Sequence, residues 1–218
     1  MVKNTIIALH TIKMRKRKLY TAFLFVCICF LMACSESEVN PVKYCNYIGL
    51  KDNGLRQIQC ENSYCYELKY LPQEYEILRR NSGIKSETAF KEELQTVENN
   101  LFFLLKLTGE NKVLMDQIKQ QKSNNWEKTL NDLRFKMQQN FKVVLQNDTF
   151  PCVLYQLEQG AFAQQEMQFS LLFDIPKAID KAKKNDFKLI INDTILCKKN
   201  MVFDISNTTI AKIPSIKF

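Results

Sequence analysis

The chain has 218 residues, a formal net charge of +8 and a single histidine, His10. Residues 1–33 hold that histidine and six of the 31 basic residues but no acidic residue, so the rest of the chain carries a net charge of about +2. A charge that small does not predict nucleic-acid binding, and without histidine the rest of the chain cannot form a Ser-His-Asp triad or a histidine metal site. The five glycines form no phosphate-binding loop, and no metal or cofactor is expected.

The first segment of the chain has the pattern of an export signal. A basic run at 13–18 precedes an uncharged, mostly apolar run at 19–33, which is the order found in secretory signals. Fifteen residues are fewer than the ~20 that a helix needs to span a bilayer. Translation from Met14 instead of Met1 would place the basic run directly at the N-terminus, and the sequence leaves both starts open.

The end of the apolar run resembles the lipobox of bacterial lipoprotein signal peptides, in the residues Leu31-Met32-Ala33-Cys34. The resemblance implies cleavage between Ala33 and Cys34 and lipid attachment at Cys34, so that the mature chain is held to a membrane. An uncleaved N-terminal membrane anchor is the alternative. Several acyl chains on one residue give stable anchoring, whereas a single chain binds only marginally.

The acidic stretch that follows Cys34 consists of Ser35, Glu36, Ser37 and Glu38. It resembles the export signal that sends Bacteroidota-type lipoproteins to the outer face of the outer membrane, and a plain polar tether is the alternative. We therefore expect an outer-membrane lipoprotein of the cell envelope and leave open which face it occupies. The expected organisation is a signal peptide at 1–33, a lipidated tether at 34–54 and one globular domain at 55–218, a length that suits a single core.

Alternating side chains predict a β-hairpin after the tether. We expect a turn at Asn62-Ser63-Tyr64 that pairs Ile58 with Leu68 and Cys60 with Tyr66. That register places Cys60 and Cys65 on opposite faces and argues against a disulfide between them. With Cys34 lipidated, an odd number of cysteines remains, so at most two disulfides form; the pairing is open among Cys45, Cys60, Cys65, Cys152 and Cys197.

The remaining elements follow from hydrophobic periodicity. Helices are expected from Ser86 to Asn99, over 112–131 with a break near 123–125, and after Ile175-Pro176. Strands are expected at 101–107, 133–146, 150–158, 167–174, 187–191 and 196–205. This order lacks regular βαβ alternation and predicts an α+β fold, mostly an antiparallel sheet or sandwich with two to three packed helices.

Three groups of residues are candidates for function. Tyr64, Tyr66 and Tyr70 would suit either a binding patch or a strand core. A basic row on the strand 133–146 would meet an anionic ligand or simply face solvent: Arg134, Lys136 and Lys142. A carboxylate pair of the glycosidase kind would have to come from Glu158, Glu166 and Asp174.

These features favour a non-enzymatic lipoprotein that binds a protein or glycan partner or serves as a subunit of an envelope complex. An immunity-type lipoprotein that neutralises a toxin or lytic enzyme is the first alternative, and a carboxylate-dependent glycan hydrolase is the second. Short stretches resemble uncharacterised Bacteroidota lipoproteins and imply no activity: Asp52 to Leu55, Tyr70 to Pro72 and Pro151 to Tyr155.

Overall fold

The computed structural model describes residues 38–81, 83–84, 86–110, 113–158, 165–176, 182 and 184–218. The expected cleavage site at Ala33 and Cys34 and the stretch Ser35 to Ser37 lie outside these residues. From Val39 onward the described residues belong to one unit. Within the described ranges no helix is both long enough and apolar enough to cross a lipid bilayer.

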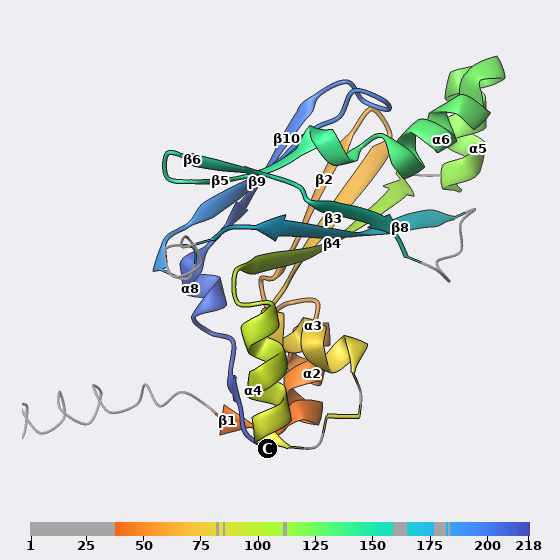
Figure 1. The fold of residues 1–218 in the computed structure, drawn as a ribbon. Coiled ribbons are helices and arrows are strands. Elements are labelled where there is room, and N and C mark those ends of the chain that lie inside the picture. The colour runs from red at the N-terminus through yellow and green to blue at the C-terminus, as the bar shows by residue number, and fades with distance from the viewer. Residues whose placement is uncertain are drawn as a thin grey trace, which may run out of the picture. The chain divides into compact units, whose positions relative to one another are not determined.

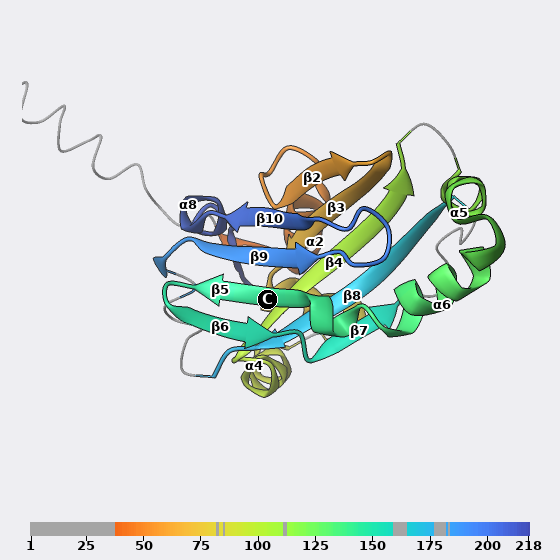
Figure 2. The ribbon, with the colours of Figure 1, turned by 90° about the horizontal axis from the view of Figure 1, so that it is seen from above.

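Two antiparallel sheets face each other and their strands cross obliquely (Figure 2). The larger sheet has the order β2 (Arg56–Glu61), β3 (Tyr64–Leu71), β4 (Asn100–Gly109), β8 (Glu166–Asp174) and β7 (Leu154–Leu157). The smaller sheet has the order β10 (Asn200–Ile205), β9 (Phe187–Asn192), β5 (Phe141–Leu145) and β6 (Asp148–Pro151). A short pair joins β1 (Glu38–Val39) to β11 (Ser215–Ile216). The expected α+β class with mostly antiparallel sheets is confirmed.

The helices gather at two ends of the domain (Figure 1). Near β1 and the C-terminus lie α2 (Pro41–Gly49), α3 (Gln73–Arg80) and α4 (Glu87–Thr96). At the opposite end lie α5 (Leu114–Lys122), the 3-10 turn Ser123–Asn125 and α6 (Trp126–Phe135). A second 3-10 turn, Gln138–Asn140, leads into β5, and the short α8 (Asn207–Ile210) follows β10. The described residues thus contain more helices than expected.

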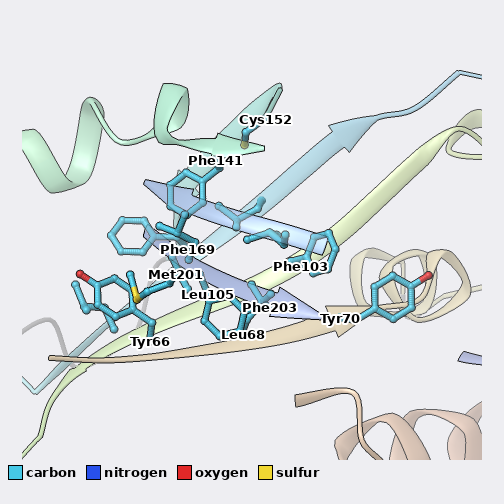
Figure 3. Close-up of a cluster of buried hydrophobic side chains, with 14 of the residues drawn as sticks. Tyr66, Leu68, Tyr70, Phe103, Leu105, Phe141, Cys152, Phe169, Met201 and Phe203 are labelled. Atoms are coloured by element: carbon cyan, nitrogen blue, oxygen red, sulfur yellow. The ribbon is translucent and has the colours of Figure 1, made fainter. Parts of the chain in front are cut away.

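The core lies between the two sheets and is rich in aromatic side chains (Figure 3). Phe103 and Phe173 meet edge to face, with ring centroids 5.7 Å apart. Tyr155 stacks on Phe141 at 5.3 Å and on Phe169 at 4.6 Å. Burying one such side chain stabilises a fold by roughly 2–3 kcal/mol. Of these contacts, the stack of Tyr155 on Phe141 joins the larger sheet to the smaller one.

Alternation along the strands predicted most of this core correctly. β8, β9 and β10 each bury every second residue, as strands with one solvated face do. β4 is buried on both faces over Leu101 to Phe103, as expected, because α3 covers its outer side. Gln73 at the start of α3 donates to the backbone oxygens of Val97, Glu98 and Asn100 and fixes the helix there.

The register of the first hairpin differs from the prediction by one residue. Its turn has two residues, Asn62 and Ser63, with φ of 50° and 69°, as a type I′ turn requires. Cys60 therefore lies opposite Cys65, and the two form a disulfide with an S–S distance of 2.04 Å. The predicted register, which placed the two cysteines on opposite faces, was wrong by one residue. A shift of one residue moves every side chain of a strand to the other face of the sheet. Ile58 consequently points outward and is 59% exposed.

The inner positions of β2 carry glutamines, and these close the gap between the two sheets. The side-chain amides of Gln57 and Gln59 donate to the backbone oxygens of Asp204 and Val202 on β10. At the other edge, the chain passes directly from β6 to β7, and Val153 donates its N–H to Leu172 on β8 at 2.8 Å. The sheets are therefore joined at both edges, one by side chains and one by the chain itself.

Three further predictions were wrong. Residues 133–146 do not form one strand, because α6 runs to Phe135 and leaves that side chain 77% exposed. Within the expected tether, residues 41–49 form α2, which begins at the cap Asn40 and buries Tyr44 and Ile48. The segment 150–158 is divided between β6 and β7. Most of the helix expected after Ile175-Pro176 lies outside the described residues.

Candidate functional site

The three tyrosines predicted as a binding patch lie inside the protein. Tyr64, Tyr66 and Tyr70 are all buried on the inner face of β3. The strand-core alternative is therefore correct, and these residues offer no surface to a ligand.

Tyr66 instead belongs to a buried polar cluster that fixes the loop between β9 and β10. Its hydroxyl donates to Asp193 at 2.5 Å, and the backbone N–H groups of Ile195, Leu196 and Cys197 donate to the same carboxylate at 2.7–2.9 Å. Burial opposes ionisation of Asp193, but the hydrogen bonds from Cys197 and Tyr66 outweigh it and lower the pKa of Asp193. Burial and the neighbouring carboxylate raise the pKa of the Cys197 thiol to about 12. A thiol with so high a pKa is a poor nucleophile, so the role of this cluster is structural.

The three carboxylates considered for a glycosidase pair do not meet at one site: Glu158, directly after β7, and Glu166 on the neighbouring β8 bind different partners, and Asp174 is remote from Glu166. Glu166 and Asp174 lie at opposite ends of β8, so about 26 Å of strand separates them. Glu158 contacts Arg79, whereas Glu166 forms an ion pair with Lys106 at 2.5 Å. Burial alone would raise the pKa of Glu166, but the hydrogen bonds from Lys106 and Gln168 lower it. A general acid needs the opposite shift, so these residues do not form the site that the hydrolase alternative would need.

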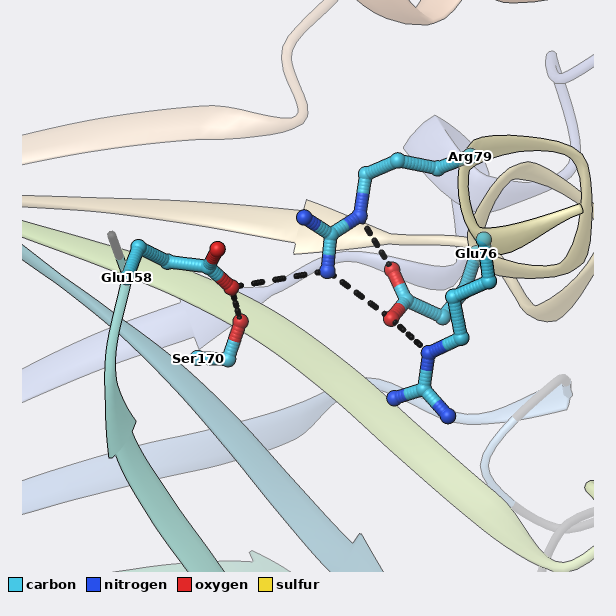
Figure 4. A network of polar contacts seen from close by, with 5 residues as sticks. Glu76, Arg79, Glu158 and Ser170 are labelled. Carbon is cyan, nitrogen blue, oxygen red and sulfur yellow. Dashed lines mark hydrogen bonds and ion pairs between the residues drawn. The ribbon is translucent and has the colours of Figure 1, made fainter. Parts of the chain in front are cut away.

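Glu158 belongs to a polar network that joins α3 to the larger sheet (Figure 4). Glu76 is almost fully buried and accepts hydrogen bonds from Arg79 at 2.9 and 3.0 Å and from Arg80 at 2.6 Å. Arg79 also lies 3.5 Å from Glu158, which accepts a hydrogen bond from Ser170. The two arginines neutralise the two carboxylates, and Glu76 raises the pKa of Arg79 further above its usual range.

The cavity beside this network is too small for a ligand. It is lined by Leu71, Glu76, Arg80, Phe102 and Ser170 among others, and its volume is about 10 Å³. That is room for about one water molecule. With its charges balanced and no ligand-sized space, the network acts as a brace between helix and sheet.

The predicted basic row is dispersed in the structure. Arg134 lies in α6, Lys136 follows the helix and forms an ion pair with Asp132 at 2.6 Å, and Lys142 is exposed on β5. The prediction of one basic strand face was therefore wrong. Only Arg134 lines a hollow large enough to hold a ligand.

That hollow, which we call the α5–α6 groove, has a volume of about 370 Å³. Binding pockets for small molecules span roughly 300–1,000 Å³. Its lining comes from one residue of α5 and five of α6: Met115, Trp126, Glu127, Leu130, Asn131 and Arg134. The groove is thus part apolar and part polar, with an aromatic ring and an arginine that are both common at binding hot spots.

Charges around the groove leave Arg134 available. Glu127, the acid that lines the groove, is exposed, and among the described residues no ion pair joins it to Arg134. Asp132, two residues before Arg134, is held by Lys128 at 2.5 Å and Lys136 at 2.6 Å, and these hydrogen bonds lower the pKa of Asp132. Among the described residues the Arg134 guanidinium forms no ion pair, and its Nε is buried without a hydrogen-bond partner. Lys119 lies over the Trp126 ring, with Nζ 4.9 Å from the centroid.

The groove is built on helices that the core holds in place. Leu114 and Ile118 of α5 and Leu133 of α6 are buried in the main core. Gln117 donates from α5 to the hairpin turn at Ser63, and Tyr155 donates from β7 to the Leu133 carbonyl at 2.6 Å. A site on braced helices keeps its shape better than one on loops.

No protein-family model matches the chain, and no curated protein matches its sequence. Several solved structures are similar to it, among them two bacterial proteins. A protein of unknown function from Burkholderia pseudomallei has 13% sequence identity and a TM-score of 0.38, over 81% of this chain and 94% of that chain. A DUF4426 family protein from Pseudomonas aeruginosa has 8% identity and a TM-score of 0.33, over 70% of this chain and 94% of that chain.

The α5–α6 groove was not predicted from the sequence. The helical spacing of Trp126 and Leu130 was visible, and Trp126 is the only tryptophan of the chain, which marks it for attention. Arg134, however, was assigned to a strand. Among the described residues no group of His, Cys, Asp and Glu is arranged to hold a metal ion.

Proposed function

We propose that this chain is a lipid-anchored, non-enzymatic binding protein of the bacterial outer membrane that holds a segment of a partner protein in the α5–α6 groove. The lipobox-like run that ends at Cys34 supports the anchor. The observation that carries the binding role is Arg134, which lines a groove beside Trp126, has a buried Nε without a hydrogen-bond partner and forms no ion pair within the described residues.

The chemistry of the groove defines the kind of segment that fits. A carboxylate would complete the hydrogen bonding of Arg134, because the planar guanidinium matches a carboxylate in a two-point contact. Trp126, Leu130 and Met115 offer apolar surface next to it. The matching segment therefore has an acidic side chain beside an aliphatic or aromatic one.

Site-specific crosslinking tests this proposal in intact cells. A photoreactive amino acid at Asn131, which lines the groove and is exposed, should give one discrete protein adduct. Arg134→Glu should remove the adduct, because a second carboxylate would repel the acidic side chain of the partner. Phe135 provides the matched control: it is exposed at the end of the same helix and does not line the groove, so a probe there should give no such adduct.

The result also separates the alternatives. An adduct that resists protease but is removed by glycan-degrading enzymes would replace the protein partner by a glycan. Absence of an adduct at Asn131, or one that Arg134→Glu leaves unchanged, would contradict the role of the groove. Protease treatment of intact and lysed cells, with a periplasmic protein as control, then decides whether the domain lies outside the cell or in the periplasm.

A further inference from the structure

The outward face of α2 carries apolar side chains at both of its ends. Val42 is 70% exposed near the start of the helix, and Leu50 is 56% exposed at its C-cap. Asn46 lies between them and is also exposed. At 3.6 residues per turn these residues share the side of the helix opposite to the buried Tyr44 and Ile48.

Lysines flank the two apolar residues. Lys43 follows Val42, Lys51 follows Leu50, and both are exposed. Among the described residues no ion pair involves either of them. An apolar face with flanking lysines is the composition of segments that lie on anionic lipid surfaces, where apolar side chains enter the headgroup region and lysines attract lipid phosphates.

The path of the chain brings this face within reach of the proposed anchor. Val39 comes immediately before the helix cap Asn40 and is fixed by the hydrogen bond from the Lys217 N–H at 2.9 Å. Cys34 is five residues upstream of Val39, which limits the distance between their Cα atoms to ~18 Å for a fully extended chain. A membrane that holds Cys34 is therefore close to the start of α2, because Val39 is two residues before that helix.

We propose that the outward face of α2 lies on the lipid surface that holds Cys34, with Val42 and Leu50 in the headgroup region. This inference rests on the proposed lipid anchor. Because α5 and α6 lie at the end of the domain opposite to β1 and α2 (Figure 1), this contact directs the α5–α6 groove away from the membrane and towards a partner.

Depth-sensitive fluorescence of the full-length, lipidated protein tests the contact. The protein is placed in vesicles of phosphatidylethanolamine and phosphatidylglycerol, with an environment-sensitive fluorescent amino acid at Val42, Leu50 or Phe135. Nitroxides on the lipid chains should quench the probes at 42 and 50. The probe at 135 is the matched control and should stay unquenched, since Phe135 is 77% exposed at the end of α6, and α6 lies at the end of the domain opposite to α2 (Figure 1).

A second set of variants tests whether the probe itself creates the membrane contact. With the probe at Asn46, Val42→Asp together with Leu50→Asp should reduce quenching to the level of position 135. Phe135→Asp should leave it unchanged, and all variants should still float with the vesicles. Equal quenching at 42, 50 and 135, or quenching that survives the double substitution, overturns the contact.

The anchor is tested separately. Incorporation of a labelled fatty acid should depend on Cys34 and be lost in Cys34→Ser. Failure of that labelling contradicts the proposed function and this inference together, whereas a lipidated protein with unquenched probes contradicts only the inference.

Discussion

Replacing Asp193 by Asn should destabilise the protein more than any exposed substitution of the same kind. The side chain is fully buried, and its two oxygens accept hydrogen bonds from three backbone N–H groups, from the Tyr66 hydroxyl and from the Cys197 thiol. Asn keeps the shape but exchanges one acceptor oxygen for an NH₂ group. At least two donors then lose their acceptor.

The size of the effect follows from those donors. A buried donor without an acceptor costs roughly 1–3 kcal/mol, so the free energy of unfolding should fall by about 3 kcal/mol at neutral pH. That is a large part of the ~5–15 kcal/mol by which domains are stable. The effect should also depend on pH, since hydrogen bonding lowers the pKa of Asp193 in the folded protein.

The sign of the pH dependence is fixed by that lowered pKa. A carboxyl whose folded pKa lies below its unfolded value of about 3.9 contributes its full stability above that pH. The contribution is lost as the pH falls through the folded pKa. Because Asn does not titrate, the difference between wild type and Asp193→Asn should narrow below about pH 4.

Urea unfolding followed by far-ultraviolet circular dichroism, at several pH values, measures both effects. Asp204→Asn is the matched control, because its side chain is 72% exposed and its ion pair with Lys188 is long at 3.5 Å; it should change stability by less than about 0.5 kcal/mol. A loss below about 1 kcal/mol for Asp193→Asn, or a loss that does not vary with pH, would refute the reasoning.

Three further outcomes are expected. Cys45 should react with a thiol reagent in the folded protein, whereas Cys152 and Cys197 should react only on unfolding. Burial shields these two thiols and raises their pKa values to about 11 and about 12; equal rates of thiol modification, measured by mass spectrometry, would contradict this. Selective reduction of the hairpin disulfide, which closes a loop with a sequence separation of 5, should cost about 2 kcal/mol in urea unfolding. Glu76→Ala should cost about 3 kcal/mol because it removes the acidic partner of Arg80 and the nearer acidic partner of Arg79. Glu87→Ala, at an exposed ion pair, should leave the stability almost unchanged; similar losses would disprove the brace.

Elements were predicted correctly from the sequence where buried and exposed residues follow the regular period of a strand or a helix. β8 alternates without interruption, and α4 begins at Ser86, whose hydroxyl accepts from the Ala89 N–H at 3.3 Å. In both, the local pattern and the packing agree. The break near residues 123–125 was also predicted correctly, because Ser and Asn favour turns over helix interiors.

The failures share a physical cause: charged or polar side chains occupy buried positions through specific partners. α3 buries Gln73 and Glu76 beside the apolar Ile77, and Glu76 contacts two arginines, so two of its three buried positions are polar and its buried face does not read as an apolar stripe. β2 turns its glutamines inward to a neighbouring backbone, which inverted the expected faces. The availability of Arg134 depends on Asp132 having two lysine partners, and such a pairing becomes visible only in three dimensions.

The glutamine contacts between β2 and β10 also affect how copies of the protein meet. Strands at the rim of a sheet carry open carbonyl and amide groups that can recruit a strand from another molecule and begin a fibril. In β10 the carbonyls of Val202 and Asp204 are already bonded to Gln59 and Gln57, and an ion pair of Lys199 with Glu61 at 2.5 Å covers the end of the same rim. These contacts keep the rim from serving as a template for polymerisation. Such protection matters most for protein molecules that are packed densely side by side on a surface.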